Sequence, residues 1–113
     1  MKHINLIIEK IRQKPGLYIG KKNLDHLATF MSGYECALNI VSQDFPYFDS
    51  KFQRFIESKY GLTYCTSHWS KIISANTTEE EAFDLFLHYW DEMKKKTGET
   101  AGVSSVSSDK TTE

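Results

Sequence analysis

The chain has 113 residues, a formal net charge of −1 and an apolar fraction of 40%, values typical of one globular domain. This balance excludes the strong basic field of a nucleic-acid-binding domain, and no apolar run reaches the roughly 18 residues of a membrane span. Charges interrupt the first apolar stretch and no small-residue cleavage site follows it, so we expect a cytoplasmic protein with reduced cysteines.

Helical periodicity begins at the N-terminus. A stripe of four isoleucines predicts a first helix that ends before Pro15: Ile4, Ile7, Ile8 and Ile11. Residues 14–23 are predicted to form a loop in which Gly16 and Gly20 adopt unusual backbone angles. In that loop Leu17, Tyr18 and Ile19 would dock on the core.

A second, longer helix is predicted from a cap at Asn23 or Asp25 to about Gln43. Its apolar stripe consists of Leu24, Leu27, Ala28, Met31, Tyr34, Leu38 and Val41. Gly33 lies inside this helix, which is explained either by a close backbone approach or by simple tolerance of a glycine that costs about 1 kcal/mol.

Three shorter patterns follow. The third helix is capped by Asp49 or Ser50 and closed by Gly61, and the fourth begins after Thr66 or Ser67. Thr78 and Glu81 form a capping box that opens the fifth. The expected core residues of these helices are Phe52, Phe55, Ile56, Tyr60, Trp69, Ile72, Ile73, Ala82, Phe83, Phe86, Leu87, Trp90 and Met93. We predict an all-α bundle of about five short helices over 1–96 and a flexible polar tail over 97–113.

Motifs that would indicate chemistry are scarce. Cys65 and His68 have a spacing that suits a metal, but the second ligand pair of a zinc site is missing from the sequence. The stretch from Pro15 to Gly20 resembles a Pro-Gly-Met-Tyr-Ile-Gly stretch of type II topoisomerase ATPase subunits. Those domains are longer than this chain and carry nucleotide-binding motifs that it lacks. We therefore predict no enzyme, no catalytic residue, no metal and no cofactor.

The charge is unevenly distributed along the chain. Residues 1–22 contain six bases and one acid, a net charge of +5, whereas residues 23–93 contain eleven acids and four bases, a net charge of −7. One explanation is the ordinary solvated surface of a helical protein. The other is an acidic face that steers and holds a basic partner.

The segment around Pro46 combines aromatic side chains with acids. We expect Tyr47 and Phe48 to be the most exposed of the twelve aromatic residues between Phe45 and Trp90. An exposed aromatic side chain beside carboxylates is typical of a protein-interface hot spot. The alternative is that this loop is a lid over the core.

The order of several short motifs resembles small helical immunity proteins of bacterial contact-dependent inhibition and polymorphic toxin systems. The resemblance covers residues 4 to about 93 and consists of Lys14 to Gly20, Gly33-Tyr34-Glu35, Ala37-Leu38, Phe52, Phe55, Tyr60-Gly61, Trp69, Lys71 to Ile73 and Glu80 to Phe86. It implies an all-helical, non-catalytic protein that blocks a toxin domain, often a nuclease. Binding residues cannot be transferred, because such interfaces differ from pair to pair.

We therefore expect a cognate immunity protein that occludes the active site of a basic nuclease toxin without binding nucleic acid or membrane. The candidate partner-binding residues are Asp44, Tyr47, Phe48, Asp49, Glu79, Glu80, Asp84 and Asp91. The alternatives are a regulatory adaptor, a DNA-binding module that touches phosphates through the basic first helix, and a small enzyme with a perturbed carboxylate or histidine.

Overall fold

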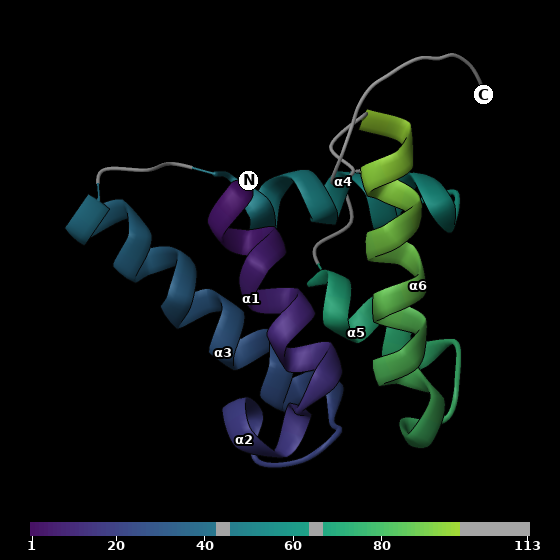
Figure 1. The fold of residues 1–113 in the computed structure, drawn as a ribbon. Coiled ribbons are helices and arrows are strands. Elements are labelled where there is room, and N and C mark those ends of the chain that lie inside the picture. The colour runs from purple at the N-terminus through teal and green to yellow at the C-terminus, as the bar shows by residue number, and fades with distance from the viewer. Residues whose placement is uncertain (43–45, 64–66, 98–113) are drawn as a thin grey trace.

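The computed structural model describes residues 1–42, 46–63 and 67–97, and these residues form helices without any strand (Figure 1). In chain order the elements are α1 (Lys2–Gln13), α2 (Pro15–Ile19), α3 (Leu24–Ala37), the π-helical segment η1 (Leu38–Ser42), α4 (Phe48–Lys59), α5 (Trp69–Ala75) and α6 (Glu79–Thr97). The predicted all-α fold is confirmed. Over the described ranges no helix is both long enough and apolar enough to cross a membrane. The predictions for Gln43, Asp44, Cys65, Thr66 and the tail beyond residue 97 fall outside the described residues.

Helix α1 buries its four isoleucines, as predicted, and is followed by a short helix rather than the expected loop. Pro15 begins α2, a position that proline suits because the first amides of a helix need no intrahelical partner. Gly16 therefore has helical geometry, which corrects its predicted role, while Gly20 has the expected positive φ of 89°. Ile19 is buried, but Leu17 is 71% exposed and does not dock on the core.

Helix α3 begins at the predicted cap, where the Asn23 side chain accepts a hydrogen bond from the backbone N–H of His26. No atom of another segment lies within 4 Å of a Cβ built on Gly33, so the helix simply tolerates this glycine. The predicted apolar stripe holds through Met31 but fails at Val41, which is exposed. The reason is that the end of this helix, the π-helical segment η1, extends beyond the core and has no buried residue.

Helix α4 begins at Phe48, with Tyr47 in the cap position and no side-chain cap of its own, so the predicted caps at Asp49 and Ser50 are wrong. Glu35 of α3 takes over this role across space. Its carboxylate accepts hydrogen bonds from the backbone N–H groups of Phe48 at 2.6 Å and Asp49 at 3.1 Å. A carboxylate at a helix N-terminus satisfies free amides and interacts favourably with the helix dipole.

The core is mainly aromatic where α4, α5 and α6 meet. Its largest rings belong to Phe48, Phe52, Trp69, Phe86 and Trp90, all at most 1% exposed. Neighbouring rings pack at centroid distances of 5.0 to 6.0 Å, mostly edge to face. Helix α6 packs against α3, α4 and α5. All predicted inward residues of the fifth helix are buried, and its start is capped by Thr78 as predicted.

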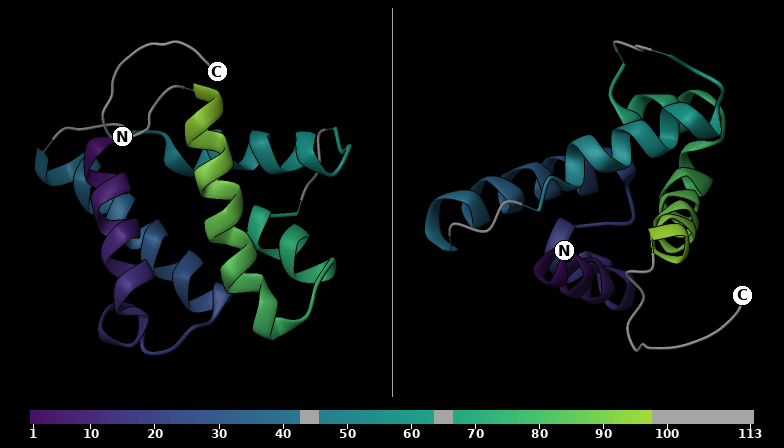
Figure 2. Two further views of the ribbon diagram at one scale, coloured as in Figure 1. Left: turned by 45° about the vertical axis from the view of Figure 1, so that its right-hand side comes forward. Right: turned by 90° about the horizontal axis from the view of Figure 1, so that it is seen from above.

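Helix α3 diverges from α1 toward its C-terminal end, so that η1 lies at the edge of the molecule, away from α5 and α6 (Figures 1 and 2). The beginning of α4 lies near the N-terminus, and the beginning of α6 lies at the opposite end of the molecule (Figure 1). The fold therefore presents two well-separated ends that carry predicted site residues.

Candidate functional site

The first candidate surface is the apolar end, which we define as Ile40 and Val41 of η1 together with Tyr47. Their exposed fractions are 73%, 82% and 60%, among the largest of the apolar side chains in the described part of the chain. Ser42 and Tyr47 are five residues apart, so their Cα atoms are separated by at most roughly 18 Å. One side of a standard protein interface covers about 800 Å², or roughly 30 Å across, and can span all three side chains.

The backbone at the apolar end is irregular in two places. Tyr47 has φ 56° and ψ 34°, the left-handed conformation that a bulky residue rarely adopts. The π-helical turn of η1 precedes it, and π-helical turns occur frequently at functional sites. Exposed apolar side chains and backbone strain thus coincide at one end of the fold, which is typical of a binding surface.

Of the predicted residues in this region, Tyr47 is exposed as expected, and Phe48 is not. Phe48 is 1% exposed and packs its ring against Trp69 and Trp90, so the prediction that it is an exposed anchor is wrong. Successive side chains of an α-helix point about 100° apart, so the first turn of α4 directs Phe48 into the core and leaves Asp49 at the surface.

Asp49 has structural partners. Its Oδ1 accepts hydrogen bonds from the indole Nε1 of the buried Trp69 at 2.9 Å and from Nε2 of His68 at 2.8 Å. The other His68 nitrogen, Nδ1, accepts from the backbone N–H of Ser70 and thereby caps α5. These hydrogen bonds select the neutral His68 tautomer that carries its proton on Nε2.

The same cluster has the composition of a hydrolytic triad, because the Ser70 hydroxyl lies 2.9 Å from His68 Nδ1. A nucleophile must also reach its substrate. Ser70 is only 4% exposed, in the first turn of α5. These hydrogen bonds connect the start of α5 to α4. The Ser70 hydroxyl is not at the surface, where a substrate would have to reach it.

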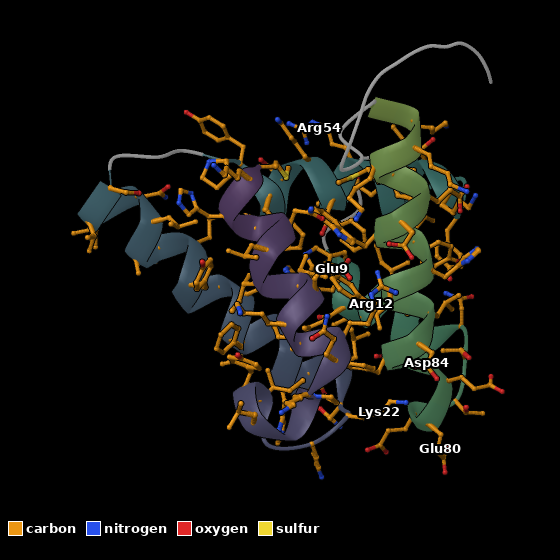
Figure 3. The ribbon with its side chains drawn as sticks, viewed as in Figure 1. Glu9, Arg12, Lys22, Arg54, Glu80 and Asp84 are labelled. Carbon is orange, nitrogen blue, oxygen red and sulfur yellow. The ribbon has the colours of Figure 1, made fainter. Side chains whose placement is uncertain are left out.

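The second candidate surface is the acidic end, which we define as Glu79, Glu80 and Asp84 of α6 together with Asp25 of α3. All four side chains are exposed. Figure 3 shows Glu80 pointing away from the fold and Asp84 beside Lys22. Lys22 pairs with Asp84 at 3.3 Å, and Lys71 lies 3.5 Å from Asp25. Glu80 has no polar partner within the described ranges.

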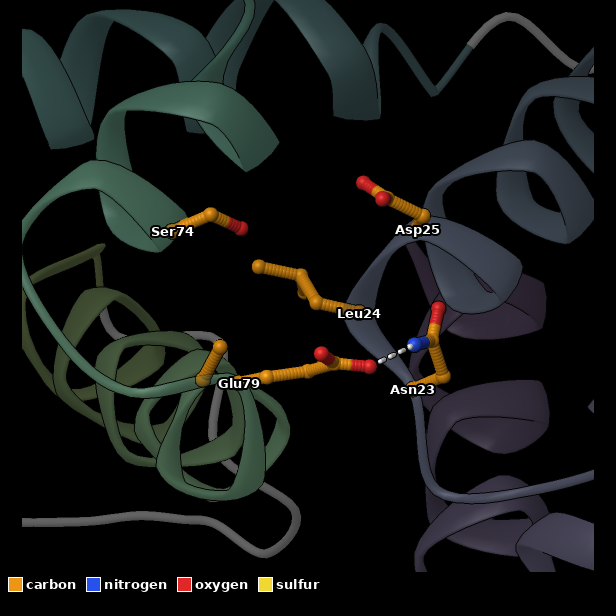
Figure 4. Close-up of a pocket in the computed structure, with 6 residues that line it drawn as sticks. Asn23, Leu24, Asp25, Ser74 and Glu79 are labelled. Atoms are coloured by element: carbon orange, nitrogen blue, oxygen red, sulfur yellow. Dashed lines mark hydrogen bonds between the residues drawn. The ribbon is translucent and has the colours of Figure 1, made fainter.

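A pocket of about 240 Å³ opens at the acidic end, between the starts of α3 and α6 and the end of α5. Its lining consists of Asn23, Leu24, Asp25, Ser74, Glu79 and Ala82. Asn23 Nδ2 donates to Glu79 Oε2 across the opening at 3.3 Å, and Leu24 lies between Ser74 and Asp25 (Figure 4). The pocket is shallow and polar, and its carboxylates are suited to receive a cationic group.

Asp91, the remaining predicted site residue, joins α6 to α1. Its Oδ1 accepts from Arg12 Nη2 at 2.7 Å, and Arg12 also pairs with Glu9 (Figure 3). Desolvation lowers the pKa of Arg12, but the hydrogen bonds to Glu9 and Asp91 outweigh it, so the net shift is upward. Two bases of residues 1–22, Arg12 and Lys22, thus pair with acids of α6 and hold α1 and the α2–α3 connection against this helix.

The structure thus brings Glu79, Glu80 and Asp84 together, and leaves Tyr47, Asp49 and Asp91 in other places. Sequence reasoning missed Asp25, whose position beside α6 depends on long-range packing. It also missed Ile40. The only sequence signal for Ile40 is that it falls outside the apolar stripe of its helix.

No protein-family model matches the chain, and neither curated proteins nor solved structures show significant similarity to it.

Proposed function

We propose that this protein is a non-catalytic binding protein that captures and neutralises one protein partner in the cytoplasm, as a cognate immunity protein neutralises its toxin. The observation that carries the proposal is the apolar end. Exposing Ile40, Val41 and Tyr47 to water gives no benefit to the isolated fold, whereas covering them in a complex is favourable.

The chemistry of the apolar end supports a protein partner. Tyrosine contributes a large contact area with little loss of conformational freedom, and such residues dominate interface hot spots. Isoleucine and valine have stiff side chains, so their burial in a complex orders few rotamers. Asp49 borders this surface and adds a carboxylate, although its hydrogen bonds to His68 and Trp69 already use one of its oxygens.

The excess negative charge of residues 23–93 favours a basic partner, and nucleases are basic where they grip phosphates. We propose occlusion as the mechanism: the apolar end anchors the partner, and the bulk of the helical domain blocks the entry of nucleic acid to its active site. The acidic end supplies a second hypothesis for the contact, in which Glu79, Glu80 and Asp84 replace phosphates.

The first experiment is to co-purify the protein with the product of the neighbouring upstream gene and to titrate the pair. A tight one-to-one complex, with a neighbour that is toxic alone and harmless when bound, would support the proposal. Absence of a complex together with a harmless neighbour would refute it.

Variants then locate the contact. The double substitution Ile40→Asp and Val41→Asp should weaken the complex at least about 30-fold, the effect of losing about 2 kcal/mol of hot-spot energy. Leu62→Asp is the control, because Leu62 is also an exposed aliphatic residue and lies beyond the opposite end of α4 from Tyr47. The free energy of unfolding should change by less than about 0.5 kcal/mol in each of these variants, because the substituted side chains are exposed.

The double substitution Glu80→Lys and Asp84→Lys tests the acidic end. If this variant loses affinity for the partner at low salt while the variant with Ile40→Asp and Val41→Asp binds normally, the contact lies at the acidic end and the apolar end is not the anchor. If the purified protein instead binds DNA with a steep dependence on salt, the DNA-binding alternative replaces the proposal.

A further inference from the structure

The exposed side of α1 carries a regular row of lysines and a leucine. Lys2, Leu6 and Lys10 follow one another at a spacing of four residues, or about 6 Å along the helix axis, and all three are exposed. Lys14 continues the row at the end of the helix. Leu6 is 54% exposed, so this face of α1 combines positive charge with an apolar side chain.

The row ends in a surface pocket formed by α1 and α2. The pocket has a volume of about 240 Å³ and is lined by Lys10, Gln13, Lys14, Leu17 and Tyr18. Two ammonium groups thus lie beside an exposed leucine and a partly buried tyrosine. We call this pocket and the row before it the α1–α2 face.

The charge of the α1–α2 face is not neutralised by the protein itself. Among the described residues, no carboxylate pairs with Lys2, Lys10 or Lys14. The other bases of this part of the chain behave differently, because Arg12 pairs with Glu9 and Asp91, and Lys22 pairs with Asp84. The bases that face α6 are paired, and those on the outer side of α1 are available.

We propose that the α1–α2 face is a docking surface for an acidic segment of a second protein, in which carboxylates alternate with aliphatic side chains. The carboxylates would pair with Lys2, Lys10 and Lys14. The aliphatic groups would cover Leu6 and enter the pocket beside Leu17.

The same observations favour a protein segment over other anions. Phosphates gain nothing from exposed leucines, and a long nucleic acid would extend beyond this small face and meet the negative field of the remaining chain, which carries −7 over residues 23–93. A membrane-surface helix requires a broad continuous apolar face. On the α1–α2 face only Leu6 and Leu17 are large apolar side chains with more than half of their surface exposed.

The pocket of this surface is separate from the apolar end, although the row before it begins at Lys2, near the start of α4 (Figure 1). The α1–α2 face ends at α2, at the far end of α3 from η1 (Figure 1). The segment that fills the pocket is therefore different from the one that would cover Ile40 and Val41, and the inference does not depend on the proposed neutralising function.

The test uses the full chain and two fluorescein-labelled synthetic peptides. In the first peptide, pairs of glutamates alternate with pairs of leucines. In the second peptide, serine replaces every leucine. The first should bind saturably and at least about threefold more tightly than the second, since covering a leucine contributes a fraction of its full burial energy. Amide resonances of α1 and α2 should shift in its NMR titration, while those of η1 and α6 stay in place.

The decisive variant is Lys10→Glu with Lys14→Glu, and its control is Lys51→Glu with Arg54→Glu on α4. All four side chains are exposed and without ion pairs among the described residues, so both variants should fold, and both change the net charge equally. The first should weaken peptide binding at least about tenfold, and the second by less than about twofold.

Three results would overturn the inference. The first is no binding of the glutamate–leucine peptide, and the second is equal loss of affinity in both variants. The third is displacement of the peptide by single-stranded DNA or by phosphatidylserine vesicles at concentrations where the serine peptide does not compete.

Discussion

Replacing Asp49 by alanine separates a structural role from a binding role for a residue that the sequence assigned to the interface. Asp49 Oδ1 is the acceptor for the indole N–H of Trp69, which is 0% exposed, and for Nε2 of His68. The substitution removes both hydrogen bonds and leaves the Trp69 indole without its acceptor inside the aromatic core.

The size of the effect follows from these two contacts. A buried donor that loses its partner costs about 1 to 3 kcal/mol, and the exposed bond to His68 adds about 0 to 1 kcal/mol. We expect Asp49→Ala to lower the free energy of unfolding by about 2 to 3 kcal/mol. For a domain of this size each kcal/mol corresponds to about 4 °C, so Tm should fall by about 8 to 12 °C.

The assay is urea and thermal unfolding followed by circular dichroism, with Asp49→Asn as the matched control. Asparagine keeps a carbonyl oxygen for the Trp69 indole, so this variant should lose about 1 kcal/mol or less. Indole fluorescence should report the change, because the lost bond involves Trp69 itself.

A loss below about 0.5 kcal/mol in Asp49→Ala would refute this account of how α4 and α5 are joined. Partner affinity gives the complementary result when it is measured well below the Tm of both variants. Unchanged affinity for the partner would show that Asp49 acts only in the fold. Weakened affinity with an unchanged free energy of unfolding would show that Asp49 contacts the partner, as the sequence predicted.

Three further predictions test other contacts. Glu35→Ala should lower the free energy of unfolding by about 1 to 2 kcal/mol in urea titrations, because α4 loses its N-terminal cap. Asp91→Ala should cost about 1 kcal/mol through its lost pair with Arg12, and partner affinity measured by calorimetry should not change. Burial and the hydrogen bond with Tyr89 raise the pKa of Tyr60 above its usual value. The unfolded chain therefore releases this proton first, stability falls as pH rises above 10, and Tyr60→Phe should lose less stability between pH 9 and 11.

The sequence by itself determined the helices and most of the core. Isoleucines at Ile4 to Ile11 and apolar residues at Ala82 to Met93 recur with the helical period, and an amphipathic face of that length has few alternatives to a packed helix. Asn23 and Thr78 were identifiable as helix starts because a cap acts within one turn of chain. These features depend on neighbours a few residues away, which a sequence displays directly.

Only the tertiary structure decided which surface residues belong together. Glu35 caps a helix 13 residues away in the chain, Asp91 pairs with a base 79 residues away, and Phe48 fills a core made by α5 and α6. Val41 is exposed because the end of its helix, the segment η1, lies beyond the core and has no buried residue. Contacts of this kind depend on how whole helices cross, and small changes in helical phase and crossing angle move a side chain from the core to the surface.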